Sequence, residues 1–223
     1  DIPSVPKRVR ATFLHKWDVT RRYIYAIEPQ DSTMFITASP MYSWVTMDSC
    51  SQCYFDNDAS FLDAPGEWFY DTVSCMLYYI PREGEHISST VATVPVADGF
   101  LKIEGTEDNR VHDLSFSGGS FKYCSYYMDW KGEDPQQAAA SSEASVMLDF
   151  ADKVKFDRCE IACTGNNGIW FRNSCRNSSL ESCYVHDLGI GGVKIGTLAI
   201  PEDEDNCPFQ CPWHYPLSKQ PSP

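Results

Sequence analysis

Apolar and polar residues alternate in short runs in the C-terminal half of the chain, and one such pattern occurs twice, 24 positions apart. Short alternation is typical of strands, because a helix would space its apolar positions three or four residues apart. Apolar positions and glycines at a fixed period indicate a β-solenoid, with coils stacked roughly 4.8 Å apart. The matched segments are 156–161 with 180–185, Gly165 with Gly189, and 168–171 with 192–195.

A looser third copy is predicted over 111–116, with Val111, Leu114 and Phe116 at the inward positions. It lies 45 residues before Phe156, so the surplus over one coil is an excursion spanning 124–145. Chance similarity between two hairpins is the alternative explanation of the repeat. The solenoid interpretation assigns residues 105–196 to parallel coils.

Residues 1–104 are predicted to form an antiparallel β-rich region, and 197–223 an acidic, proline-rich loop or tail that does not continue the coils. The fold class is therefore all-β, a β-solenoid with a preceding or inserted antiparallel region. The turn Pro65-Gly66 leads into a hairpin. Strands are predicted over 9–14, 23–27, 34–37, 67–71, 75–80, 91–96 and 101–103.

The composition favours an extracellular protein. A net charge of −13 argues against nucleic acid or an anionic membrane as partner, and no apolar run is long enough to span a membrane. Ten cysteines, with no signal peptide remaining at Asp1, predict a mature secreted chain with several disulfides. Asn177 opens an N-glycosylation sequon, which fits the same compartment.

The cysteine spacings leave two questions open. Cys50/Cys53 and Cys207/Cys211 resemble metal-ligand spacings, but no Cys/His set completes a tetrahedron, so we expect no metal and no cofactor. Cys159 and Cys183 occupy equivalent inward positions of adjacent coils. They are either bonded to each other or part of a ladder of small buried side chains.

Several segments together resemble right-handed parallel β-helix glycosidases, and the nearest group is glycoside hydrolase family 141. Order and spacing agree over roughly residues 8–196. The segments that carry the resemblance are 62–71, 77–81, 84–85, 101–105, 114–118, 165–170 and 186–196.

The resemblance implies an extracellular right-handed β-helix with an inserted β-rich region, acting on α-L-fucosides or xylans. Members of the family are longer, with further coils that would hold the catalytic carboxylates. It therefore implies that this chain is a fragment or processed portion of the catalytic solenoid. A second chain, attached through Cys207 or Cys211, would carry the remaining coils.

Glycoside hydrolysis needs two carboxyl groups facing one bond. Asp157 and Glu181 are predicted to share an outward column, which His112 would extend on the earlier coil; a solvated acidic ladder is the structural alternative. His186 and Asp187 are the stronger catalytic candidates, because a histidine beside a carboxylate can exchange protons or hold a sugar hydroxyl. The alternative for Asp187 is capping of the following turn amides.

Four residues are predicted to bind substrate: Trp170, Lys194, Glu160 and Trp17. An exposed Trp170 would give a sugar ring an apolar platform, whereas a covered one would belong to the packing of the inserted region. Trp17 would otherwise be a partly buried edge aromatic.

Two functions remain open from the sequence. One is a secreted carbohydrate-active enzyme; the other is a non-catalytic extracellular protein that binds glycans or self-assembles into a matrix or fibre through its open coil ends. Motifs of proteases and nucleotide enzymes are missing from the sequence.

Overall fold

The computed structural model describes residues 8–16, 19–37, 47–134, 139 and 142–197. The chain divides into two compact units. The first comprises residues 1–92 and 128–137, and the second comprises 93–127 and 138–223.

The first unit is antiparallel. Its main sheet has the order β3-β2-β1-β4, and β5 pairs with β6 as the predicted hairpin. Its core contains Val9, Ala11, Phe13 and Ile24. The elements are β1 (Arg10–Leu14), β2 (Val19–Glu28), β3 (Thr33–Ile36), β4 (Gln52–Asp56), β5 (Trp68–Asp71), β6 (Met76–Tyr79) and the 3-10 turns η2 (Pro29–Asp31) and η3 (Ala59–Phe61).

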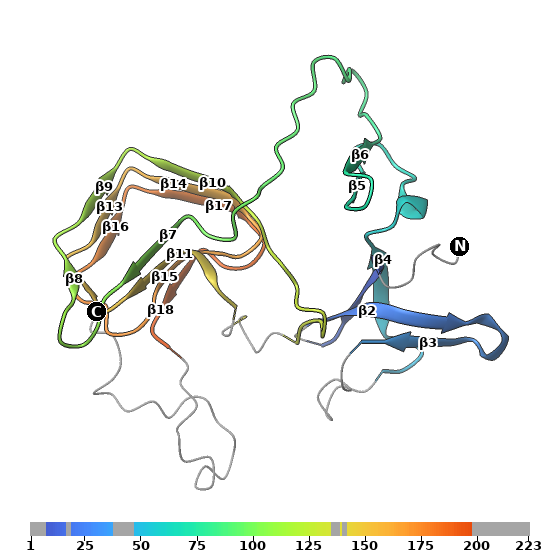
Figure 1. Cartoon of the computed structure of the whole chain (residues 1–223), viewed down its shortest axis with the longest axis horizontal. Coiled ribbons are helices and arrows are strands. Elements are labelled where there is room, and N and C mark those ends of the chain that lie inside the picture. Colours follow the sequence, from blue (N-terminus) through green and yellow to red (C-terminus); the bar gives the residue numbers. More distant parts are fainter. Residues whose placement is uncertain (1–7, 17–18, 38–46, 135–138, 140–141, 198–223) are drawn as a thin grey trace, which may run out of the picture. The chain divides into compact units, whose positions relative to one another are not determined.

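The second unit consists of parallel strands stacked coil on coil (Figure 1). Its sheets have the orders β18-β15-β11-β7, β16-β13-β9, β10-β14-β17 and β12-β8. The strands are β7 (Leu101–Glu104), β8 (Val111–His112), β9 (Ser115–Ser117), β10 (Ser120–Cys124), β11 (Ala144–Asp149), β12 (Ala151–Asp152), β13 (Lys155–Asp157), β14 (Glu160–Thr164), β15 (Asn167–Phe171), β16 (Ser179–Glu181), β17 (Tyr184–Leu188) and β18 (Val193–Ile195).

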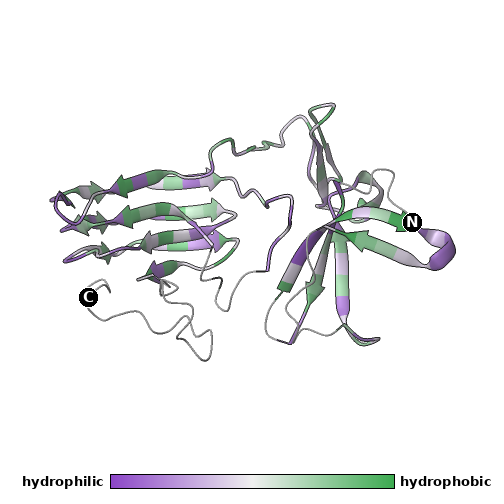
Figure 2. Ribbon diagram, turned by 60° about the horizontal axis from the view of Figure 1, so that its bottom comes forward, coloured by the Kyte–Doolittle hydropathy of each residue, from purple (hydrophilic) through white to green (hydrophobic). Residues whose placement is uncertain are grey.

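The predicted 24-residue period is confirmed by the strand register. Phe156 pairs with Leu180, and Ile161 with Val185. The backbone of Gly168 meets the turn at Gly192, since a Cβ on Gly168 would lie 2.7 Å from the Gly192 carbonyl oxygen. The two segments are therefore successive turns of one coil, and the stacked strands carry both hydrophobic and hydrophilic residues (Figure 2).

The register of the third copy was predicted wrongly. Phe116 pairs with Phe156, 40 positions later, whereas the sequence comparison placed Val111 there at an offset of 45. His112 consequently pairs with Asp152, and Ser117 takes the place beside Asp157 that was predicted for His112. The reason is that small residues at 117–120 replace the larger ones of the later coils and hide the match.

Left-handed backbone recurs at the same place in each coil. Non-glycine residues rarely adopt positive φ, so its repetition at the coil offsets shows that stacking dictates the conformation. One column is Gly118, Arg158 and Ser182, with φ of 67°, 49° and 50°. The others are Asp113, Lys153 and Asn177; Tyr123, Cys163 and Asp187; and Phe150 with Ser174.

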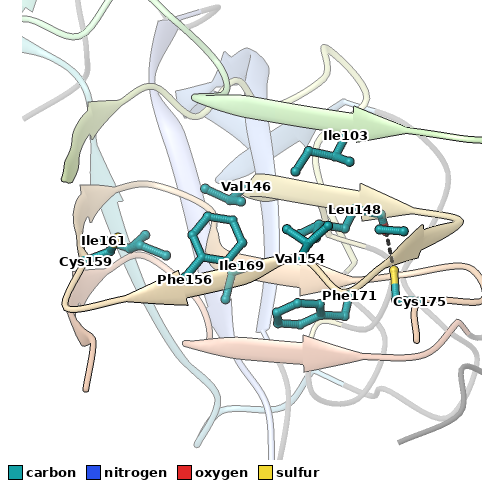
Figure 3. Close-up of a cluster of buried hydrophobic side chains, with 11 residues drawn as sticks. Ile103, Val146, Leu148, Val154, Phe156, Cys159, Ile161, Ile169, Phe171 and Cys175 are labelled. Atoms are coloured by element: carbon teal, nitrogen blue, oxygen red, sulfur yellow. Dashed lines mark hydrogen bonds between the residues drawn. The ribbon is translucent and has the colours of Figure 1, made fainter. Parts of the chain in front are cut away.

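The core of the coils is a column of inward side chains (Figure 3). Phe116 stacks on Phe156 with ring centroids 4.9 Å apart, and Phe156 is fully buried. Its partner on the last described coil, Leu180, is only partly buried. The middle coil is therefore the best-packed layer of the described stack.

The cysteines differ from the expectation of several disulfides. All eight in the described residues are free thiols, and Cys207 and Cys211 lie outside them. Cys159 and Cys183 form a ladder, with the Cys159 amide donating to the Cys183 sulfur at 3.3 Å. Cys50 and Cys53 are exposed.

Residues 91–96 form no strand, contrary to prediction. Val91 and Val96 are each 89% exposed, so these apolar residues have no sheet to pack against.

The structure is thus all-β, with antiparallel and parallel sheets and almost no helix. Among the described residues, no helix has the length and apolar character needed to cross a membrane.

Close backbone approach between coils is tested by a matched pair of glycines. A Cβ on Gly189 would lie 2.3 Å from the Gly165 carbonyl oxygen, whereas one on Gly119 would meet nothing within 4 Å. We expect Gly189→Ala to lower the free energy of unfolding by about 1–3 kcal/mol because backbone must shift. Gly119→Ala should be nearly neutral. Chemical denaturation of both variants checks this, and equal effects would contradict it.

Candidate functional site

A group of polar side chains covers the outer face of the β10-β14-β17 sheet. Parallel register places Ser120 beside Glu160, and Ala162 between Lys122 and His186. Residues of adjacent strands therefore stand one coil apart and can reach one another. We call Ser120, Lys122, Glu160, His186 and Asp187 the outer polar cluster.

Glu160 is the centre of this cluster. Lys122 Nζ lies 2.9 Å from its Oε1, and the Ser120 hydroxyl donates to its Oε2 at 2.9 Å. His186 Nε2 lies 3.0 Å from Oε1. These partners come from the two coils on either side of Glu160, so only the stacked structure assembles them.

His186 lies between two carboxylates. Its Nδ1 is 2.8 Å from Asp187 Oδ2, on the side opposite Glu160. The ring also stacks on Tyr184, with centroids 3.9 Å apart. The His186 imidazole is thus fixed in position by Glu160, Asp187 and Tyr184.

A break in the β-ladder places Asp187 next to His186. Ala162 pairs with His186 and Thr164 with Leu188, while Cys163 and Asp187 are left out of the register with positive φ. No extra residue is inserted, because the strands stay 24 positions apart on both sides of the break. The positive φ of Asp187 interrupts strand alternation, so the adjacent residues 186 and 187 make contact.

The charges in the cluster shift one another's protonation. Hydrogen bonds from Lys122, then His186 and Ser120, lower the pKa of Glu160 to about 2. The hydrogen bond with Asp187, followed by that with Glu160, raises the pKa of His186. Glu160 also raises the pKa of Lys122. At neutral pH the cluster therefore holds a carboxylate acceptor and a cationic donor, which can form charge-assisted hydrogen bonds.

A general acid needs a carboxyl with a raised pKa. Every carboxyl whose pKa departs from its usual value in the described part of the chain shifts downward: Glu67, Asp71, Glu85, Asp149, Glu160 and Glu181. In the outer polar cluster Glu160 is therefore ionised at neutral pH and carries no proton to transfer. The side chains there whose pKa is raised are His186 and Lys122.

Trp170 and Lys194 lie together on β15 and β18. Trp170 is 7% exposed, and its indole nitrogen donates to the Gly196 carbonyl at 2.7 Å. Lys194 Nζ lies 3.5 Å from the ring centroid and donates to the Ser142 carbonyl at 2.6 Å. Burial, then repulsion by Arg172, lowers the pKa of Lys194 to about 8. Trp170 is therefore covered rather than presented as a platform, and substrate binding by this pair stays a prediction.

The Asp157–Glu181 column is confirmed, and both carboxylates have cationic partners. Glu181 lies 2.6 Å from Lys155, and Asp157 lies 2.9 Å from Arg158. This is the solvated ladder considered as the structural alternative.

The other predicted residues are less informative. Asn177 lies at an exposed left-handed corner, with its amide donating to Asp152 at 2.9 Å. Trp17 lies outside the described residues. In the described part, no group of three or more potential metal ligands is present.

The sequence prediction missed Ser120 and Lys122. Aligning 116–122 with 156–162 at an offset of 40 would have placed Ser120 beside Glu160. It would have placed Lys122 beside Ala162, two residues further along the same strand. The glycines Gly118 and Gly119 within this segment obscured that alignment.

The arrangement defines a class: an all-β protein with stacked parallel coils and an antiparallel inserted unit. Residues 8–82 match the model of the GH141 insertion domain. The chain is similar to a solved structure titled "Glycoside hydrolase", with a TM-score of 0.70 and 20% sequence identity. That similarity covers 86% of this chain and 41% of the solved chain; no curated protein matches.

The chain thus resembles family 141 glycoside hydrolases over part of its length, as the sequence motifs indicated. It spans about two fifths of the length of the solved relative.

The charge arrangement around His186 is tested by its titration. Because its pKa is raised above the ordinary 6.5, its contribution to stability is complete below that pH and is lost as pH rises through the folded-state pKa. We expect Glu160→Gln to lower the pKa of His186 in NMR titrations. Glu181→Gln is the control, because Glu181 binds Lys155 instead, and it should leave the pKa of His186 unchanged. An unchanged His186 pKa in Glu160→Gln would contradict the proposed contact.

Proposed function

We propose that this chain is part of a secreted carbohydrate-active protein related in function to family 141 glycosidases, with α-L-fucosides or xylans as ligands. The match of residues 8–82 to the insertion domain carries the proposal, because it adds a sequence signal to the likeness in fold. The coils would wind right-handed, as nearly all parallel crossover connections do.

In this proposal the outer polar cluster holds sugar hydroxyls. Glu160 accepts hydrogen bonds from the ligand and Lys122 donates them. Both ring nitrogens of His186 stay bonded to Glu160 and Asp187, so His186 holds the carboxylates in position. The catalytic carboxylate pair would lie in further coils stacked beyond β16, β17 and β18. Support comes from Leu180 and Val185, which are only partly buried although their partners Phe156 and Ile161 are fully buried.

The second candidate is a non-catalytic glycan-binding or matrix-forming protein on the same scaffold. It is favoured by the outer polar cluster itself, in which three hydrogen bonds hold Glu160 in place as an acceptor.

The outer polar cluster is tested with fucosylated xyloglucan and arabinoxylan in affinity electrophoresis. We expect the 223-residue chain to be retarded, and Glu160→Gln to weaken binding about tenfold by removing charge-assisted hydrogen bonds. Glu181→Gln is the matched control, because Glu181 pairs with Lys155 as Glu160 pairs with Lys122.

Release of sugar from the same glycans tests where the carboxylate pair lies. Release by the 223-residue chain would contradict a pair in further coils, whereas retardation without release is the result expected of both candidates. If neither occurs, both candidates are overturned.

Secretion is tested through Asn177. The side chain is exposed, so a chain that passes through the secretory pathway should carry a glycan there. We expect the intact mass from a eukaryotic secretory host to fall on treatment with a peptide N-glycosidase. Asn177→Gln should abolish that mass difference. An unglycosylated wild-type product would contradict the expectation.

A further inference from the structure

The first unit contains a hollow lined by aromatic side chains. Its volume is about 340 Å³, and we call it the aromatic hollow; its lining is Tyr23, Ile24, Tyr25, Thr37, Met128 and Trp130. Tyr25 is 60% exposed and Trp130 66%. One ring belongs to β2 and the other to the segment 128–134. Their exposure needs a physical explanation, because burying large aromatic rings would be favourable.

A β-bulge explains the orientation of Tyr25. On β2, Ile24 pairs with Ile36 of β3 and Ala26 pairs with Phe35, so Tyr25 is the extra residue between them. Its neighbour Ile24 is 1% exposed and belongs to the core. The bulge therefore displays Tyr25 at the surface while the strand keeps its packing, a device common beside binding sites.

Trp130 is placed by a segment that is distant in sequence. Residues 128–134 lie along β2 through a bridge in which Arg21 and Glu133 exchange backbone hydrogen bonds of 2.9 and 2.8 Å. The Arg22 side chain, 3% exposed, forms an ion pair with Asp134. Thr20 also donates to Asp134 at 2.7 Å.

Close packing fixes this segment further. Gly132 has φ of +83°, and a Cβ there would lie 2.2 Å from the Arg21 carbonyl oxygen, so no other residue fits. The Tyr23 hydroxyl donates to the Met128 carbonyl at 3.4 Å. Part-buried hydrogen bonds and an ion pair with a buried guanidinium thus support the exposed ring of Trp130.

The chemistry of the lining selects a ligand class. None of the six lining side chains is charged, and the chain carries a net charge of −13. One cation lies near the lining, Lys131, whose Nζ is 5.6 Å from the Trp130 ring centroid. An anionic ligand would still be repelled by the net charge of the protein as a whole. A neutral pyranose presents C–H groups to aromatic faces and hydroxyls to the phenols of Tyr23 and Tyr25.

We propose that the aromatic hollow binds a sugar unit of a neutral glycan. The proposal rests on the carbohydrate function proposed above and adds a second binding site, within the inserted unit and separate from the outer polar cluster. The two rings stack on the sugar, and the small volume admits one or two sugar units.

Affinity electrophoresis in arabinoxylan and fucosylated xyloglucan tests this site. We expect Trp130→Ala and Tyr25→Ala each to weaken binding about five- to tenfold, the usual value of one aromatic contact. Trp130→Phe should keep part of the affinity. Trp68→Ala is the matched control, because Trp68 is 67% exposed in the same unit but does not line the hollow. Polygalacturonate, an anionic polymer, should not retard the protein.

Each outcome decides the proposal. It is overturned if Trp130→Ala binds like wild type, if Trp68→Ala loses as much affinity, or if polygalacturonate retards the protein equally. Binding that Glu160→Gln abolishes and that Trp130→Ala leaves unchanged would also overturn it, while the proposed function stands. Loss of binding in Trp130→Ala but not in Glu160→Gln supports the aromatic hollow and removes the outer polar cluster as the binding place. Unchanged circular dichroism of each variant shows that the fold is intact.

Discussion

The parallel stacking of coils is the constraint on which the rest of the second unit depends. Each coil must repeat the backbone of its neighbour to keep the inter-strand hydrogen bonds. As a result, equivalent residues of adjacent coils adopt an unfavourable positive φ. Residues as different as Lys153 and Asn177 adopt positive φ at the same corner because the stack requires it. Where backbones approach most closely, as Gly189 does at Gly165, no side chain fits at all.

The same stacking produces the outer polar cluster. Residues in register across coils form columns, so polar side chains of β10 and β17 come within hydrogen-bonding distance of Glu160 on β14. Glu160 receives hydrogen bonds from two neighbouring coils and is held as a carboxylate, with its pKa lowered to about 2. A group held so firmly in one protonation state is suited to recognition rather than proton transfer.

The inserted unit holds its exposed aromatic side chains in place through an antiparallel sheet. Its antiparallel sheet is closed on one side by residues 128–134, which return from between β10 and β11 to pair with β2. The buried Arg22–Asp134 ion pair needs that exact pairing, since a buried guanidinium without a carboxylate would be unfavourable. A rigid support of this kind lets Trp130 and Tyr25 stay exposed.

The sequence by itself determined the all-β class, the 24-residue period, the β5–β6 hairpin and the likeness to family 141, because strand alternation and glycine turns are local signals. It also singled out His186 and Asp187. It misplaced the first coil by five residues, since Gly118 and Gly119 carry no side-chain pattern to align. Tertiary structure alone decided that Lys122 meets Glu160, that Trp170 is covered, and that Trp130 lies beside Tyr25. Those contacts join residues 26 to 105 positions apart, and their geometry depends on register and bulges that no short segment encodes.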